Sequence, residues 1–302
     1  MAFEGLANNV LRLAGSPPFI YGTAWKKGNT TALVKEALAA GFKAVDTAGQ
    51  PKHYEEDLVG DALRETFKLG KLRRESIFLQ TKFTSPPGHD LNNMPYDINS
   101  PLDTQLRDSI SSSLYNLRPS DSPDSVNDSY IDCLLLHSPL RTMQTTLQAW
   151  SLLETYVPHQ IRSLGISNVT APELQAIYES AKVKPAVVQN RFYPATRYDV
   201  PVRDFCTKNG ILYESFWTLT ANPQLRMSEP VRGLSQLAGV SGEVALYALV
   251  MDLGIAVLNG TTSAQRMRED LEAIVTVKKW AGEHPGEWEF VRGAFRGVVQ
   301  SA

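Results

Sequence analysis

The stretch KAVDTAGQPKHYEEDLVGDALRETFKLGKLRRESIFLQTKF, residues 43–83, carries the pattern that decides the fold. It opens with a short apolar run (43–48) and closes with a second one (76–83), and such runs are typical of strands buried in a sheet. Between them, apolar side chains recur at steps of three and four residues from Leu58 to Phe67, and Gly70 follows where a helix would end. A strand, a helix and a second strand predict a parallel βαβ unit.

The same alternation continues along the whole chain. Runs that predict strands occur eight times, at residues 19–24, 43–48, 76–83, 130–139, 161–168, 185–192, 211–217 and 255–260. Eight βα units close most naturally into a barrel, so we predict an α/β protein with a (β/α)8 TIM barrel and treat residues 1–302 as one domain. A doubly wound open sheet is the alternative, but YGTAWKKGNTT after the first strand lacks the GxGxxG that such a sheet would favour.

Four further segments have predictable roles. Residues 84–105 are rich in Pro, Gly, Asn and Asp, which predicts a long loop over the carboxyl end of the barrel. Residues 120–129 read as a polar connector. Residues 241–254 predict a helix with one apolar stripe facing the barrel, and residues 284–297 predict a closing helix packed against it.

Composition excludes several classes of function. The net charge is -2, with 30 basic and 32 acidic residues, so we expect no nucleic-acid partner. Cys133 and Cys206 lie in or beside apolar segments and read as buried thiols. No apolar run reaches the ~20 residues of a membrane span, and residues 1–19 lack the pattern of a signal peptide. We therefore expect a cytoplasmic protein without a membrane partner, and no strand-end cluster with the spacing of a metal site.

Polar side chains follow three of the predicted strands. Asp46, Lys82 and His137 lie at the carboxyl ends of their runs, and Tyr54 lies just beyond Asp46. In a parallel barrel these ends share one mouth, where active sites are built. A phenol has a pKa of ~10, so it exchanges a proton near neutral pH only if a cation beside it stabilises the phenolate. Lys82 can be that cation while it is paired to Asp46. With His137 orienting a carbonyl oxygen, this set favours carbonyl reduction by hydride.

These residues also carry a family resemblance. AVDTA, HYEEDLVGDAL, QTKF and DCLLLHSP resemble the Asp, Tyr, Lys and His tetrad of the aldo-keto reductases, and GISN, PAVVQN and RMREDL resemble further motifs of that family. The similarity extends from about residue 17 to residue 278 and looks most like fungal members. It implies a TIM barrel, a nicotinamide cofactor at the carboxyl mouth, and Tyr54 as the general acid.

The resemblance also implies how the cofactor and substrate are bound. Ser167, Asn168 and Gln189 would bond the carboxamide, and Phe216 would stack on the nicotinamide ring; helix capping and core packing are the alternatives for these residues. Trp25, His137 and Ser138 would line the substrate pocket. The other implied cofactor contacts are Thr23, Asp46, Leu219, Thr261, Arg266 and Asp270.

Two departures from the family pattern leave alternatives open. Eight positions separate Asp46 from Tyr54, and counting back from Val59 and Gly60 would place His53 in the slot of the tyrosine. At the position of Gly260, many relatives have a lysine that binds the 2′-phosphate of the cofactor. Arg266, with Thr261, Thr262 and Ser263, still favours NADPH, and NADH is the alternative. Arg266 as a solvated helix residue is the competing interpretation.

We therefore predict an NADPH-dependent reductase of a small-molecule aldehyde or ketone, a monomer or weak dimer, with a detoxifying or secondary-metabolite role. Alcohol oxidation or imine reduction at the same residues is one alternative. A cofactor-binding regulatory barrel with incidental turnover is the other.

Overall fold

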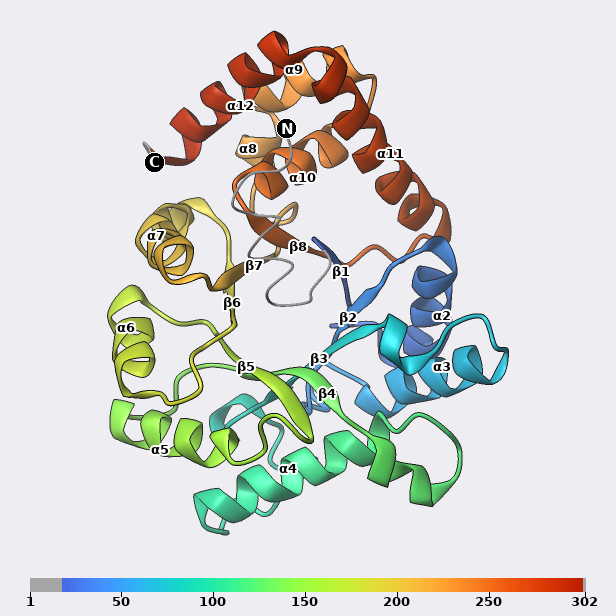
Figure 1. The fold of residues 1–302 in the computed structure, drawn as a ribbon, viewed down its shortest axis with the longest axis vertical. Helices are drawn as coiled ribbons and strands as arrows, with labels where there is room; N and C mark the ends of the chain where they lie inside the picture. The colour runs from blue at the N-terminus through green and yellow to red at the C-terminus, as the bar shows by residue number, and fades with distance from the viewer. Residues whose placement is uncertain (1–17, 301–302) are drawn as a thin grey trace.

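The computed structural model describes residues 18–300, which form a closed eight-stranded barrel (Figure 1). Each strand pairs in parallel with the next, and β8 pairs with β1 to close the barrel. The predicted fold class is therefore confirmed. The strands are β1 (Phe19–Gly22), β2 (Ala44–Asp46), β3 (Phe78–Phe83), β4 (Ile131–Leu136), β5 (Ile161–Ser167), β6 (Val187–Arg191), β7 (Leu212–Phe216) and β8 (Ile255–Asn259).

Helices surround the strands as an outer ring (Figure 1). They are α2 (Thr30–Ala40), α3 (Glu56–Lys68), α4 (Leu102–Asn116), α5 (Met143–Glu154), α6 (Ala171–Ser180), α7 (Val200–Asn209), α8 (Pro223–Arg226), α9 (Glu229–Ala238), α10 (Gly242–Asp252), α11 (Ala264–Glu283) and α12 (Pro285–Gln300). Short 3-10 turns lie at Lys27–Asn29, Arg74–Ser76, Pro86–Gly88, Pro123–Asp128 and Pro194–Asp199. A large apolar core fills the space between strands and helices.

The interior of the barrel is layered. Ala44, Phe78, Val187 and Leu212 belong to a small apolar cluster inside it. Because side chains in a strand alternate between faces, the residues two positions further on also point inward. Those residues are Asp46, Gln80, Gln189 and Glu214, so a polar layer lies directly above the apolar one. On β5 this packing needs a glycine, since a Cβ on Gly165 would lie 2.7 Å from the Val187 carbonyl oxygen.

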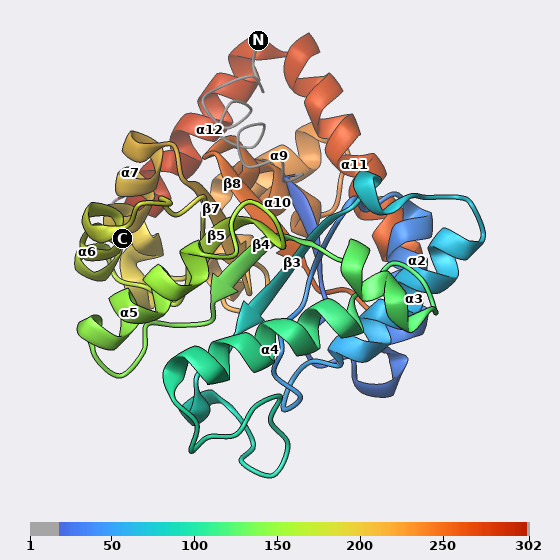
Figure 2. The ribbon, with the colours of Figure 1, turned by 60° about the horizontal axis from the view of Figure 1, so that its bottom comes forward.

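The strands are shorter than the sequence predicted, and this places site residues in loops. β4 ends at Leu136 and β5 at Ser167, so His137 and Asn168 both follow a strand. The predicted loop 84–105 is wrong at its end, because α4 begins at Leu102 directly after Pro101, a residue well suited to a helix start. The connector 120–129 contains a 3-10 turn at Pro123–Asp128. Figure 2 shows the segment before α4 projecting at the end of the barrel to which β3 and β4 point.

The prediction of a one-sided stripe on residues 241–254 is wrong. Every residue from Val244 to Met251 is buried, because α9, α11 and α12 cover the outer side of α10. The closing helix predicted at 284–297 is present as α12; it packs against α9, α10 and α11 with Trp288, Val291, Phe295 and Val299 buried, while Phe290 is exposed. Asp252 at the end of α10 pairs with Arg296 of α12 at 3.1 Å, which ties the last helix to the barrel.

Between residues 18 and 300 no single helix is both long and apolar enough to cross a membrane; α9 and α10 reach that length only as a pair bent by 109°. The sequence features of residues 1–17 lie outside the described part of the chain. Cys133 and Cys206 are free and buried, as predicted.

Candidate active site

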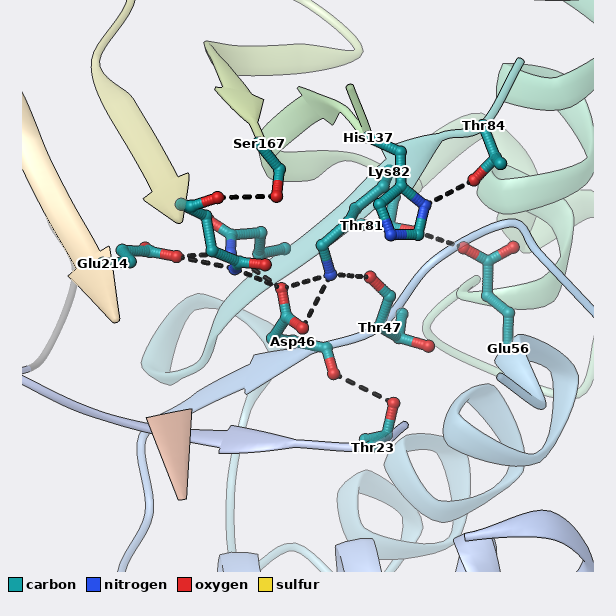
Figure 3. Close-up of polar contacts among 12 residues, drawn as sticks. Thr23, Asp46, Thr47, Glu56, Thr81, Lys82, Thr84, His137, Ser167 and Glu214 are labelled. Carbon is teal, nitrogen blue, oxygen red and sulfur yellow. Dashed lines mark hydrogen bonds and ion pairs between the residues drawn. The ribbon is translucent and has the colours of Figure 1, made fainter. Parts of the chain in front are cut away.

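A buried ion pair lies at the centre of the barrel mouth. The Lys82 ammonium donates to both carboxylate oxygens of Asp46 at 2.7 Å and to the Thr47 carbonyl at 2.8 Å (Figure 3). Thr23 donates from its hydroxyl to the Asp46 carbonyl. Burial alone lowers the pKa of Lys82, but Asp46, Tyr54 and Glu214 more than offset this and raise it, so the ammonium stays charged. The expected pairing of Asp46 with Lys82 is therefore present.

A second carboxyl group, from Glu214 on β7, faces this pair through two amides. Gln80 and Gln189 each donate from their side-chain nitrogen to Asp46 Oδ1, at 2.8 and 3.0 Å, and to Glu214 Oε2, at 2.8 and 2.9 Å. Oε1 of Glu214 has no hydrogen-bond partner among residues 18–300. Burial raises the pKa of Glu214 to about 7, the two amides partly oppose the rise, and Asp46 adds to it.

This shift predicts how stability depends on pH. The folded protein holds the Glu214 proton more tightly than the unfolded chain, whose glutamate pKa is near 4.5. Stability from this group is therefore complete below pH 4.5 and falls as pH rises to about 7, by about 3 kcal/mol in total. We expect Glu214→Gln to remove that decline. Urea unfolding of both proteins between pH 4.5 and 8 checks this, and identical pH slopes would contradict it.

The structure distinguishes the two candidates for the catalytic slot, Tyr54 and His53, because their rings contact different residues. Lys82 Nζ lies 5.0 Å from the centroid of the Tyr54 ring, and the Tyr54 and His137 rings meet edge to face at 6.0 Å. His53 instead stacks on Trp25, with ring centroids 3.8 Å apart. Of the two candidates, Tyr54 is the one beside the buried ion pair. Burial raises the pKa of Tyr54, and Lys82 only opposes the rise, so the phenol keeps its proton at neutral pH.

His137 follows β4 and is fixed by a residue that follows the neighbouring strand β3. Its Nδ1 lies 2.6 Å from the Thr84 hydroxyl, just after β3. Burial, with Lys82, His89 and His53 adding to it, lowers the pKa of His137 to about 3. The imidazole is therefore neutral across the physiological range, which suits a hydrogen bond to a carbonyl oxygen.

The three residues expected to bind the carboxamide lie together, on or just after β5 and β6. The Ser167 hydroxyl donates to the Gln189 backbone carbonyl at 2.6 Å, and Asn168 Nδ2 donates to Ser167 Oγ and to the His137 carbonyl. Asn168 adopts a left-handed backbone conformation, with φ of 54°. Such conformations cost free energy and often mark functional positions.

A lysine that the sequence analysis did not single out, Lys26, lies at the end of β8. The Lys26 ammonium donates to the Gly260 carbonyl, and a Cβ on Gly260 would lie 3.8 Å from that nitrogen. The Lys26 ammonium thus lies beside Gly260, the position where many relatives have a lysine, although 234 positions separate the two residues in the chain. Burial lowers the pKa of Lys26, and it forms no ion pair with the residues described. Arg266 is exposed nearby on α11.

Some of the remaining predicted site residues lie at the barrel mouth, and others form contacts that support the fold. Trp25 is 58% exposed and has φ of 65°, so a strained backbone presents its ring to solvent. Phe216 ends β7 and is partly buried, as are Ser138 and Leu219. Thr261 accepts from the Tyr21 hydroxyl on its carbonyl, and Asp270 accepts from Asn259 at 2.7 Å. Asp270 therefore holds the end of β8.

Sequence reasoning missed Gln80, Glu214, Thr84 and Lys26. For Glu214 a signal was present, because an acid inside the apolar run ILYESFW is costly unless it is bonded. Nothing local marks Gln80 or Lys26 as partners of residues far along the chain. Among the described residues no group of three or more His, Cys, Asp and Glu side chains could hold a metal.

A closed parallel barrel with a buried Asp–Lys pair, a phenol and a neutral imidazole at its carboxyl mouth defines a (β/α)8 oxidoreductase site. The Aldo/keto reductase family model matches residues 20–226. The chain belongs to the aldo/keto reductase family, which confirms the resemblance and the assignment as an oxidoreductase that reduces carbonyl groups.

Named relatives of this chain include fungal enzymes. It is 26% identical to an NAD/NADP-dependent indole-3-acetaldehyde reductase of Schizosaccharomyces pombe, covering 79% of this chain and 76% of the relative. It is also 26% identical to a glycerol 2-dehydrogenase (NADP(+)) of Hypocrea jecorina, covering 85% and 86%. A Bombyx mori aldo-keto reductase solved in complex with NADP has the same fold, with a TM-score of 0.68 at 20% identity over 87% of this chain and 89% of that one.

Proposed function

We propose that this protein reduces an aldehyde or ketone to an alcohol with NADPH, and that Tyr54 donates the proton. The observation that supports this most directly is that Tyr54 lies between His137 and the buried Lys82–Asp46 pair, with its ring 5.0 Å from Lys82 Nζ and 6.0 Å from the His137 ring. The named relatives that reduce aldehydes or use NADP point the same way.

Each residue has a distinct part in this proposal. His137 and the Tyr54 hydroxyl bind the substrate oxygen, and Tyr54 transfers its proton to that oxygen as negative charge develops there. Lys82 stabilises the resulting phenolate, and Asp46 holds Lys82 in place through two contacts of 2.7 Å. The bound nicotinamide supplies the hydride.

The residues at the mouth fit such a cofactor. Ser167, Asn168 and Gln189 offer amide and hydroxyl groups in one place. At the end of β8, Lys26 donates only to a backbone carbonyl among described residues, so its charge is free to meet a phosphate. Thr261, Ser263 and Arg266 at the start of α11 would add to this phosphate site.

Lys26→Met tests the choice between NADPH and NADH. The two cofactors differ by one phosphate, so losing a charge that contacts it should raise the Kd for NADPH about tenfold more than the Kd for NADH. Cofactor fluorescence titration measures both values. Lys27→Met, which removes an exposed neighbouring charge, is the matched control. Equal changes for the two cofactors would show that Lys26 does not select NADPH.

A panel of aldehydes and ketones, assayed by loss of reduced-nicotinamide absorbance, tests the function itself. Turnover with several carbonyl compounds is the expected result. Tight NADPH binding without oxidation by any of them, even in a single turnover, would favour a regulatory barrel. Imines and alcohols belong in the same panel, because the same residues serve both reactions.

Several assignments stay predictions from the sequence. They are a single domain over residues 1–302, a monomer or weak dimer, a cytoplasmic location, no nucleic-acid or membrane partner, and a detoxifying or secondary-metabolite role.

A further inference from the structure

Arg191, the last residue of β6, faces the same barrel mouth as the proposed active site. Gln189, two positions earlier, points inward, because its amide reaches Asp46 at 3.0 Å. Side chains of a strand alternate between faces, so Arg191 points inward as well, roughly 6–7 Å nearer the mouth. The register agrees, since Gln189 lies opposite Glu214 and Arg191 opposite Phe216. On β3, Lys82 likewise lies two positions after Gln80, and both side chains point inward.

Three aromatic rings surround the Arg191 guanidinium. Its Cζ lies 4.1 Å from the centroid of Trp217, 5.0 Å from that of Tyr193 and 5.9 Å from that of Phe216. Trp217 is 48% exposed and has φ of 57°, so a strained backbone holds its ring against the cation. Stacking fixes the plane of the guanidinium and leaves its edge donors available.

No acidic side chain neutralises this cation. Within residues 18–300, the Arg191 side chain forms no ion pair and donates no hydrogen bond, and its buried Nε has no partner. The other arginines that lie over aromatic rings all have polar partners. Arg74 and Arg162 lie on Tyr130 and pair with Asp132 at 2.8 and 3.9 Å, and Arg118 and Arg203 donate to the backbone carbonyls of Tyr115 and Tyr198. Glu214, opposite Gln189 on the adjacent strand β7, accepts from Gln80 and Gln189 and forms no ion pair with Arg191.

We propose that Arg191 binds an oxyanion of a ligand at the barrel mouth. A planar guanidinium binds a carboxylate or phosphate through two parallel hydrogen bonds. The geometry favours the carboxylate of an acidic carbonyl substrate. The groups available for cofactor phosphate lie at β8 and β1, around Lys26 and Gly260, whereas Arg191 lies two strands away on β6. This substrate class rests on the proposed carbonyl reduction.

Matched substrates and variants test the proposal. The kcat/KM of the NADPH-loaded enzyme is measured for 4-carboxybenzaldehyde and for its neutral methyl ester, which has nearly the same shape. We expect Arg191→Gln to lower the acid-to-ester ratio of kcat/KM by about 10- to 100-fold, the usual effect of losing a bidentate charged contact. Arg191→Lys should recover part of the ratio. Arg162→Gln, which removes a stacked arginine at the amino end of β5, should leave the ratio unchanged.

The two sources of the oxyanion give different results. A carboxylate contact changes the acid-to-ester ratio, whereas a cofactor contact raises the Kd for NADPH and lowers kcat/KM equally for both aldehydes. Either result supports an oxyanion site at Arg191. An unchanged ratio together with an unchanged Kd would overturn it.

Calorimetric titration measures ligand binding without turnover, so its result does not depend on the proposed carbonyl reduction. Benzoate and NADPH are titrated into wild type and Arg191→Gln, and weaker binding of either ligand by the variant supports the site without any turnover. If wild type reduces neither aldehyde, carbonyl reduction fails while this titration still decides the role of Arg191. Unchanged binding of both ligands would overturn the proposal.

Discussion

Tyr54→Phe is expected to lower kcat for carbonyl reduction by about 10²- to 10⁴-fold, the usual contribution of a positioned general acid. The substitution removes only the hydroxyl, and the ring beside Lys82 and His137 remains. Binding of NADPH should change little, because the phenol acts on the substrate oxygen. Steady-state kinetics with an aldehyde, together with a fluorescence titration of NADPH, measure both quantities.

His53→Ala is the control for this experiment. His53 stacks on Trp25 at the edge of the mouth, so its loss should alter KM more than kcat. The assignment would be wrong if Tyr54→Phe kept near-normal turnover while His53→Ala abolished it.

Lys82→Met should abolish turnover and also destabilise the fold by about 3–5 kcal/mol. Removing one member of a buried ion pair leaves the other charge without compensation, and the Asp46 carboxylate is 2% exposed. Without the ammonium, nothing in the described site would stabilise a Tyr54 phenolate. Urea unfolding measures the loss of stability, and single-turnover oxidation of NADPH measures the loss of activity.

Two variants separate these effects. Lys35→Met removes a lysine from the exposed pair with Glu65, and such a pair contributes under about 1 kcal/mol. Adding Asp46→Asn to Lys82→Met removes the uncompensated charge, so stability should partly return while activity does not. If Lys82→Met were as stable as Lys35→Met, the ion pair would not be the buried element that the structure describes.

Local patterns were sufficient for the architecture. Alternating apolar runs and amphipathic segments predicted all eight strands, because strand and helix periodicity are properties of neighbouring residues. Their ends were less well predicted. Strand limits depend on where hydrogen-bonded pairing to the adjacent strand stops, as β2 ending at Asp46 shows, and this pairing joins segments far apart in the chain.

The reactive residues at the strand ends could also be predicted from the sequence, because alternating strands and helices place the carboxyl end of every strand at the same mouth of the barrel. The sequence therefore predicted that Asp46, Lys82 and His137 would lie near one another. It left two candidates, His53 and Tyr54, for the same slot. Only the turn before α3 decides between them, because it directs one ring toward Trp25 and the other toward Lys82.

The sequence by itself thus determined the barrel, the family and the placement of Asp46, Lys82 and His137 at its mouth. The tertiary structure alone decided which side chains surround them. Glu214 meets Asp46 only through amides from β3 and β6, Lys26 reaches Gly260 across the closure of the barrel, and Arg191 lies among three rings without an acid. These contacts join strands distant in sequence, so their distances and their effects on pKa exist only once the barrel has closed.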